Sequence, residues 1–206
     1  MPPIFIATSS MGKLRDFAAA AAGVEVSGLP GFDSLPPVTE DGATFEENAR
    51  KKAGHYSRLA PGKLVLADDS GLAVEALGGA PGVRSARYAV GEGPEAAARG
   101  SLGQANNARL LRELESVPDQ ARAARFVCVI AAAREGKTLA VFRGEAAGLI
   151  ARAPRGGGGF GYDPLFYFPK LGKTFAELAP EEKATVSHRG AAFRKFLKWY
   201  RLSAER

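Results

Sequence analysis

The chain has 206 residues, of which 46% are hydrophobic and 24% charged, and its formal net charge is +6. This composition can form a hydrophobic core without a metal or disulfide staple, so we expect one globular domain spanning residues 1–206, or two small lobes that share a sheet. The single cysteine, Cys128, lies in an apolar run, which indicates a buried side chain rather than a reactive thiol. The chain has neither a basic, signal-like start nor an apolar run of roughly 18 residues, and we expect a cytoplasmic protein with no membrane partner.

The excess of positive charge favours an anionic partner. The lysines and arginines are scattered along the chain and form neither a polybasic tail nor a strip interleaved with aromatic residues. This distribution favours small polyanions such as nucleotides over duplex DNA, and we expect no nucleic-acid partner.

The first third of the chain alternates strands and helices. The expected order is strand 4–7, helix 13–22, helix 45–60 and strand 63–67. A stretch rich in proline and glycine precedes the second helix, where Thr44 and Glu47 have the spacing of a capping box. Asp68 and Asp69 follow the second strand directly, and we expect them at its carboxyl end.

The rest of the chain predicts a hairpin between longer connections. The expected order is loop 78–94, helix 95–115 weakened by Gly100 and Gly103, antiparallel strands 125–133 and 138–150, glycine-rich loop 151–166 and an amphipathic helix after Ser187. Because strands alternate with helices but also form a hairpin, the expected fold is α/β with a long mixed sheet flanked by helices.

The segment TSSMGK follows the first predicted strand and opens a helix. The hydroxyl groups of Thr8, Ser9 and Ser10, the backbone around Gly12 and the ammonium of Lys13 would meet at a helix N-terminus, where unpaired N–H groups favour phosphate. The segment lacks the glycine pattern of a P-loop, and taken alone it is better explained by an ordinary serine N-cap beside a solvated lysine.

The carboxylate pair follows the second predicted strand. Neighbours on an extended backbone face opposite sides, so one of Asp68 and Asp69 would face a ligand crevice and the other would support it. Carboxylates beside a phosphate require a cation between them, which predicts Mg²⁺, with Glu40 as a further acidic ligand. A turn with an aspartate cap is the alternative.

The sequence GGGGFGYDPLF places aromatic side chains among glycines, which suits close approach to a flat ring stacked on Phe160 or Tyr162. His188 and Arg189 open the last helix, and they could donate hydrogen bonds to a base or a phosphate. A flexible hairpin and ordinary surface residues are the alternatives. With only two histidines in the chain, a histidine-rich zinc site is not expected.

Five segments in this order resemble the inosine triphosphate pyrophosphatase family. They are TSSMGK, TFEENARKKA, ADDSGLAVEALGGAPGVRSARYA, GGFGYDPLF and EEKATVSHRG. The resemblance covers nearly the whole chain. It implies a magnesium-dependent homodimer that hydrolyses ITP, dITP and XTP to the monophosphate and pyrophosphate, with two lobes around a deep active-site cleft.

The resemblance also implies residue roles. Asp69 would be the general base and a metal ligand, with Asp68 and Glu40 as further carboxylates on the metal side. The implied substrate-binding residues are Thr8, Ser9, Ser10, Met11, Gly12, Lys13, Ser70, Phe160, Gly161, Tyr162, Asp163, Lys183, His188 and Arg189. One departure is that Ser9 and Ser10 stand where the family usually has Gly and Asn, which removes an amide donor and the backbone freedom of glycine.

Two other functions fit parts of the sequence. A Maf-like pyrophosphatase acting on modified pyrimidine nucleotides would share the general layout. A basic nucleic-acid-binding module without catalysis would predict salt-sensitive binding and no pyrophosphate release. The paired aspartates argue against the second alternative.

Overall fold

The structure is a computed structural model that describes residues 3–90 and 101–204. Its helices are α1 (Met11–Ala19), α2 (Phe45–Arg58), α4 (Leu102–Glu113), α5 (Pro180–Val186) and α6 (His188–Ala204). Its strands are β1 (Ile4–Ile6), β2 (Val26–Gly28), β3 (Val65–Val74), β4 (Ala123–Arg134), β5 (Lys137–Ile150), β6 (Phe166–Phe168) and β7 (Lys173–Thr174). Among the described residues, no helix has the length and apolar character needed to cross a membrane.

The chain divides into two compact units. Unit 1 comprises residues 1–70, 127–145 and 180–206, and unit 2 comprises residues 71–126 and 146–179. The seven strands have the order β2-β1-β3-β4-β5-β6-β7, and β3, β4 and β5 each contribute residues to both units. β1 pairs in parallel with β2 and β3, whereas β6 pairs antiparallel with β5 and β7, so the sheet is mixed, as expected.

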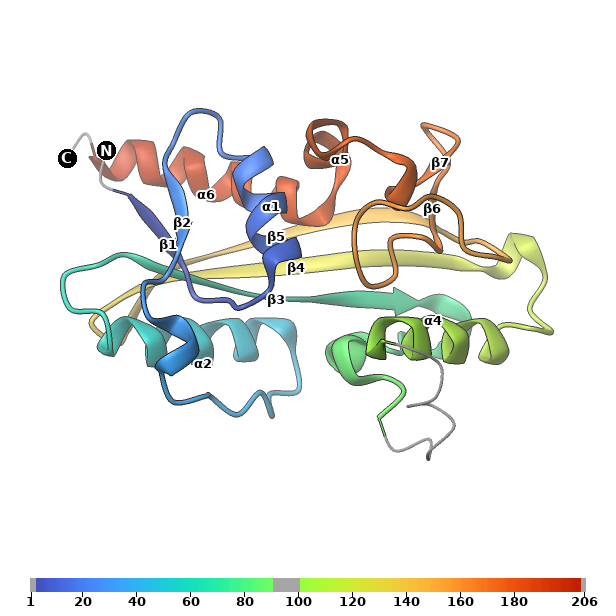
Figure 1. Cartoon of the computed structure of the whole chain (residues 1–206), viewed down its shortest axis with the longest axis horizontal. Coiled ribbons are helices and arrows are strands. Elements are labelled where there is room, and N and C mark those ends of the chain that lie inside the picture. The colour runs from blue at the N-terminus through green and yellow to red at the C-terminus, as the bar shows by residue number, and fades with distance from the viewer. Residues whose placement is uncertain (1–2, 91–100, 205–206) are drawn as a thin grey trace. The chain divides into compact units, whose positions relative to one another are not determined.

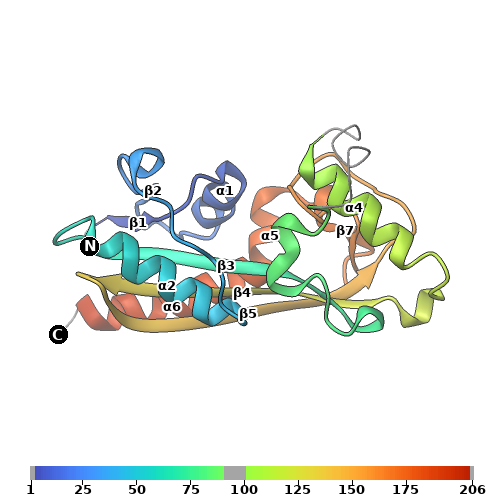
Figure 2. The same cartoon turned by 90° about the horizontal axis from the view of Figure 1, so that it is seen from below.

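Unit 1 has a sheet with helices on both faces (Figure 1). On one face, Leu66 of β3 and Ile130 of β4 pack with Phe17 of α1 and Phe193 of α6. On the other face, β3 and β4 turn their alternate residues toward Ala49, Ala53 and Tyr56 of α2, the helix seen against the strands in Figure 2. Strands buried on both faces need apolar residues throughout, which explains the unbroken apolar runs in the sequence.

Unit 2 has an aromatic core. The rings of Phe126, Phe166, Phe168 and Phe175 contact one another with centroid separations of 4.6–5.9 Å. Residues 82–87, expected in a loop, form a 3-10 helix instead. The side chain of Asn106 in α4 accepts from Ala89 N–H at 2.8 Å and donates to the carbonyl oxygens of Ser85 and Ala86 in the 3-10 helix. One buried amide therefore holds residues 85–89 against α4.

Several local predictions are confirmed. Glu135 and Gly136, both with positive φ, make the tight turn between β4 and β5, which suits a two-residue hairpin. Ser187 caps α6 by accepting the N–H of Gly190 at 3.1 Å. Thr44 caps α2, although the Glu47 carboxylate accepts from Ala43 N–H rather than completing a capping box.

Other boundaries differ from the expectation. The strand expected to end at Ala67 continues to Val74, so Asp68 and Asp69 lie inside β3 rather than at its end. Both carboxylates have cationic partners, which makes them compatible with a buried strand. The short strands β2, β6 and β7 and the helix α5 were not expected. Of the expected helix 95–115, the part before residue 101 lies outside the described residues, and the remainder appears as α4.

Candidate active site

The adjacent carboxylates of β3 face opposite sides of the unit 1 sheet. Asp68 lies on the same face of β3 as Leu66 and contacts side chains of α1 and α6. Asp69 lies on the opposite face, with Ala67, and contacts side chains of α2. Both are buried, with 2% and 8% of their surface exposed. Strand geometry therefore gives two neighbouring residues of one type different chemical surroundings.

Asp68 is enclosed by positive charge. Lys13 Nζ lies 3.0 Å from its Oδ1, Arg189 Nη2 lies 3.3 Å from its Oδ2, and the Ser70 hydroxyl donates to the same Oδ2 at 3.0 Å. Burial alone would raise the pKa of Asp68, but the charges of Lys13 and Arg189 outweigh it and hold the pKa well below its usual range. Asp68 is therefore a permanently ionised carboxylate at working pH.

Asp69 has a weaker set of partners. The Asn48 amide donates to its Oδ2 at 3.0 Å, and Lys52 Nζ lies 3.3 Å from its Oδ1. Burial raises the pKa of Asp69 above its usual value, and the opposing effects of Lys52 and Asn48 do not cancel the rise. Neighbouring carboxylates whose pKa values shift in opposite directions are typical of an acid–base site.

Glu40 joins Asp69 through a shared cation. Lys52 Nζ lies 2.6 Å from Glu40 Oε2, so one ammonium group contacts both carboxylates. Burial by itself would lower the pKa of Lys52, but the nearby carboxylates, Asp69 first among them, have the larger effect. The pKa of Lys52 is therefore raised above its usual value, and the ammonium group stays charged. Two carboxylates that share an ammonium group can also share a metal ion. Among the described residues, no group of three or more His, Cys, Asp or Glu side chains is arranged to hold one.

The TSSMGK segment leads from β1 into α1. Thr8 Oγ1 accepts from Ser10 N–H at 3.1 Å, and Ser10 caps the helix by accepting from Lys13 N–H at 3.3 Å. The serine N-cap considered as an alternative is therefore present. Met11 is 66% exposed. Lys13 extends to Asp68, so the helix start carries a cation next to a fixed carboxylate.

The residues expected from the last motif are buried in unit 1. Arg189 donates to Asp16 Oδ2 at 2.6 Å and to Ser70 Oγ at 2.8 Å, besides its contact with Asp68. Lys183 Nζ lies 3.2 Å from Asp16 Oδ1. Burial, with the charges of Arg189 and Lys183, lowers the pKa of His188 well below its usual value and keeps the imidazole neutral. These contacts make Arg189 a support for Asp68, and its contact with a purine stays a prediction.

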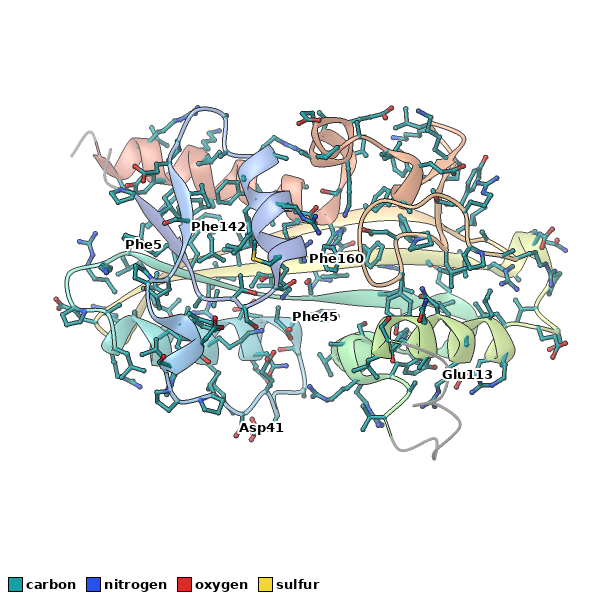
Figure 3. All side chains as sticks on the ribbon, in the orientation of Figure 1. Phe5, Asp41, Phe45, Glu113, Phe142 and Phe160 are labelled. Carbon is teal, nitrogen blue, oxygen red and sulfur yellow. The ribbon has the colours of Figure 1, made fainter. Side chains whose placement is uncertain are left out.

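The glycine-loop residues belong to unit 2. Phe160, labelled in Figure 3, is partly buried, and its N–H donates to Asp163 Oδ2 at 2.8 Å. A Cβ on Gly159, where φ is +69°, would collide with Asp163 Oδ2 and lie 2.8 Å from Asp163 Cβ, so glycine is needed there. Tyr162 is 5% exposed and donates to the carbonyl of Ser85 at 2.9 Å. Asp163 and Tyr162 thus shape the loop, and Gly161 accepts from the Asn107 amide at 3.0 Å.

Unit 1 therefore brings together Lys13, Asp68, Ser70 and Arg189 on one face of the sheet, and Glu40 and Asp69 around Lys52 on the other. Sequence reasoning missed Asn48, Lys52 and Asp16. The i, i+4 spacing of Asn48 and Lys52 could have placed both on one face of α2. No comparable signal marks Asp16.

Comparison with known proteins shows which proteins the chain resembles. The model of the Ham1 family matches residues 4–199. A dITP/XTP pyrophosphatase of Geobacillus kaustophilus is 54% identical over 197 residues, which cover 95% of this chain and 92% of the relative. One of Acidobacterium capsulatum is 50% identical over 196 residues, covering 94% and 96%. The Ham1 protein structure of Staphylococcus aureus is 39% identical, covers 100% of both chains and has a TM-score of 0.79.

Proposed function

The chain belongs to the Ham1 family, and we propose that it hydrolyses the non-canonical purine nucleotides ITP, dITP and XTP to the nucleoside monophosphate and pyrophosphate. The observation that carries this proposal is the identity of 54% with a dITP/XTP pyrophosphatase across 95% of the chain. In unit 1, the opposite pKa shifts of the buried Asp68 and Asp69 support an acid–base role for this pair in the proposed reaction.

The residues of unit 1 fit a magnesium ion. Mg²⁺ commonly binds one or two protein carboxylates and takes its remaining ligands from water and substrate phosphate. Asp69 and Glu40 are the proposed ligands, because both already approach one ammonium group, that of Lys52. Asp68 is proposed as the supporting carboxylate, since its two oxygens are held by Lys13 and Arg189. The ion, when bound, would neutralise phosphate charge and polarise a water molecule.

The chain's own groups account for the rest of the proposed chemistry. Asp69, with its raised pKa, would accept a proton from the attacking water. Lys13 and the N–H groups that open α1 would hold phosphate oxygens and stabilise their growing negative charge, with Thr8, Ser9 and Ser10 as further hydrogen-bonding groups. Asp68 would hold the Lys13 ammonium group in place.

We also propose roles for the remaining predicted residues. The base pocket would be formed by Phe160, Gly161, Tyr162 and Asp163. Tyr162 and Asp163 would contribute by fixing the shape of the loop through their hydrogen bonds. Lys183, His188 and Arg189 of unit 1 are further proposed substrate-binding residues. Hypoxanthine and xanthine carry an O6 acceptor where adenine carries an amino group, and donors aimed at O6 would therefore reject ATP.

The test is pyrophosphate release from ITP, dITP, XTP, GTP and ATP, with modified dUTP and dTTP as pyrimidine substrates, each with and without Mg²⁺. We expect fast release from the first three nucleotides, dependent on Mg²⁺, and slow release from ATP. Preferred turnover of a modified pyrimidine would point to the Maf-like alternative. Release that does not depend on a divalent cation would contradict the proposed metal site.

Three further statements about the chain are proposals. We propose that the two units act as one catalytic domain, that the protein is cytoplasmic, and that it forms a homodimer without a nucleic-acid partner. A light-scattering mass near that of one 21.6 kDa chain would refute the dimer. Salt-sensitive retention on single-stranded or duplex DNA would refute the absence of a nucleic-acid partner.

A further inference from the structure

Asn48 is a buried amide that the proposed reaction has not used. It lies in the first turns of α2, is 1% exposed, and uses both ends of its side chain. Its Oδ1 accepts from the Gly42 N–H at 2.8 Å, and its Nδ2 donates to Asp69 Oδ2 at 3.0 Å. One side chain therefore ties the loop before α2 to the carboxylate in β3.

The first of these contacts fixes the acidic loop. Glu40 lies two residues before Gly42, and the neighbouring Ala43 N–H is held by the Glu47 carboxylate at 2.8 Å. A Cβ on Gly42 would lie 2.7 Å from Asn48 Oδ1 and 2.8 Å from Glu47 Cβ, which is closer than Cβ atoms pack. The loop thus approaches α2 so closely that only glycine fits. Asp41, labelled at the bottom of Figure 3, marks this loop.

The second contact selects the orientation of the Asp69 carboxylate. Because Asn48 holds Oδ2, the other oxygen, Oδ1, is the one that faces Lys52 Nζ at 3.3 Å. Lys52 stands four residues after Asn48, on the same side of α2, and its ammonium also contacts Glu40. An amide can do this because it carries a donor and an acceptor in one planar group.

We infer that Asn48 is a positioning residue, which holds the Asp69 carboxylate and the loop carrying Glu40 so that both carboxylates face one divalent-cation position. The inference rests on the proposed function, because it takes Asp69 and Glu40 as the metal ligands. It assigns Asn48 no contact with substrate. A metal site needs its ligands held by such outer contacts, and losing one commonly weakens metal binding by about 10–100-fold.

The test measures cation binding separately from turnover. Mn²⁺ serves as the probe, titrated into the substrate-free full-length protein and followed by electron paramagnetic resonance. Asn48→Leu removes both hydrogen bonds at similar volume, and we expect its half-saturating Mn²⁺ concentration to rise about tenfold or more. In the pyrophosphate assay, kcat for dITP should fall while the KM for dITP stays within about threefold, because the nucleotide contacts are untouched.

Two comparisons separate positioning from general damage. Asn106→Leu removes a buried amide of the same type from α4, 4% exposed, whose bonds go to backbone groups of unit 2. It should lower the unfolding temperature and leave Mn²⁺ binding unchanged.

Gly42→Ala is a second test of the same contact, for use if Asn48→Leu does not fold. It keeps Asn48 and changes a loop residue rather than a helix residue. It should also weaken Mn²⁺ binding, whereas Gly103→Ala in α4 should not, because a Cβ there would lie at an ordinary contact distance of 3.7 Å from Ser101 Oγ.

The outcomes are distinguishable. If the wild-type protein binds Mn²⁺ and hydrolyses dITP, but Asn48→Leu and Gly42→Ala bind Mn²⁺ as the wild type does, the positioning role is overturned and the proposed function stands. If the wild-type protein neither binds Mn²⁺ nor releases pyrophosphate, both are overturned. Equal weakening by Asn48→Leu and Asn106→Leu would assign the effect to lost stability and overturn the positioning role.

Discussion

Replacing Asp68 by asparagine should destabilise the protein strongly, because it leaves the buried Arg189 and the half-buried Lys13 without their carboxylate. Arg189 is 2% exposed and Lys13 Nζ lies 3.0 Å from Asp68 Oδ1. In Asp68→Asn, the amide oxygen can still accept a hydrogen bond from one of the two cations. The amide nitrogen then faces the other cation, and because both groups are donors they cannot form a hydrogen bond. The variant therefore breaks two charge contacts of a buried carboxylate while keeping the size of the side chain.

The magnitude follows from the partners that remain. Removing one member of a buried ion pair commonly costs about 3–5 kcal/mol. Arg189 keeps its contact with Asp16 at 2.6 Å, so we expect the lower end, about 3 kcal/mol. For a chain of this size, each kcal/mol shifts the unfolding temperature by about 2–4 °C, which predicts a fall of about 6–12 °C.

The assay is urea unfolding followed by circular dichroism at pH 7, without added divalent cation. Asp41→Asn is the matched control, because Asp41 pairs with Lys51 at an exposed position where solvent screens the charges, and it should change stability far less. Equal losses for the two variants, or a loss below about 1 kcal/mol for Asp68→Asn, would refute the reasoning.

The pH dependence gives a second check on the same contact. The folded pKa of Asp68 is lowered, so its stabilising contribution is present above the unfolded pKa of about 3.9 and is lost as pH falls toward the folded value. The difference in unfolding free energy between wild type and Asp68→Asn should therefore shrink below about pH 4. A difference that grows with acidification would contradict the assigned direction.

Three further variants test other parts of the structure. Asp69→Asn should nearly abolish Mg²⁺-dependent pyrophosphate release from dITP with an unchanged circular dichroism spectrum, and near-normal turnover would remove Asp69 from the mechanism. Gly144→Ala should cost about 3 kcal/mol in urea unfolding, because its Cβ would collide with the His188 carbonyl oxygen; a wild-type midpoint would contradict that packing. Tyr162→Phe should lower the free energy of unfolding by about 1 kcal/mol, because it loses the hydrogen bond to the Ser85 carbonyl. Thermal unfolding measures this loss, and an unchanged unfolding temperature would contradict it.

The local elements were predictable where short-range chemistry decides them. The tight turn at Glu135 and Gly136 and the cap at Ser187 depend only on nearby residues, and both are confirmed. The end of β3 was not predictable in this way. Polar residues at 68–70 suggested that the strand had finished, whereas cations from distant segments allow it to continue to Val74.

The sequence by itself determined that Asp68 and Asp69 point in opposite directions, because successive side chains of a strand alternate. It also carried the segments that resemble the family to which the chain belongs. Only the tertiary structure decided their partners. Asp68 meets Arg189, 121 residues away, and Asp69 meets Asn48, 21 residues away. Such contacts depend on which helices cover each face of the sheet, and the packing of distant apolar surfaces fixes that choice.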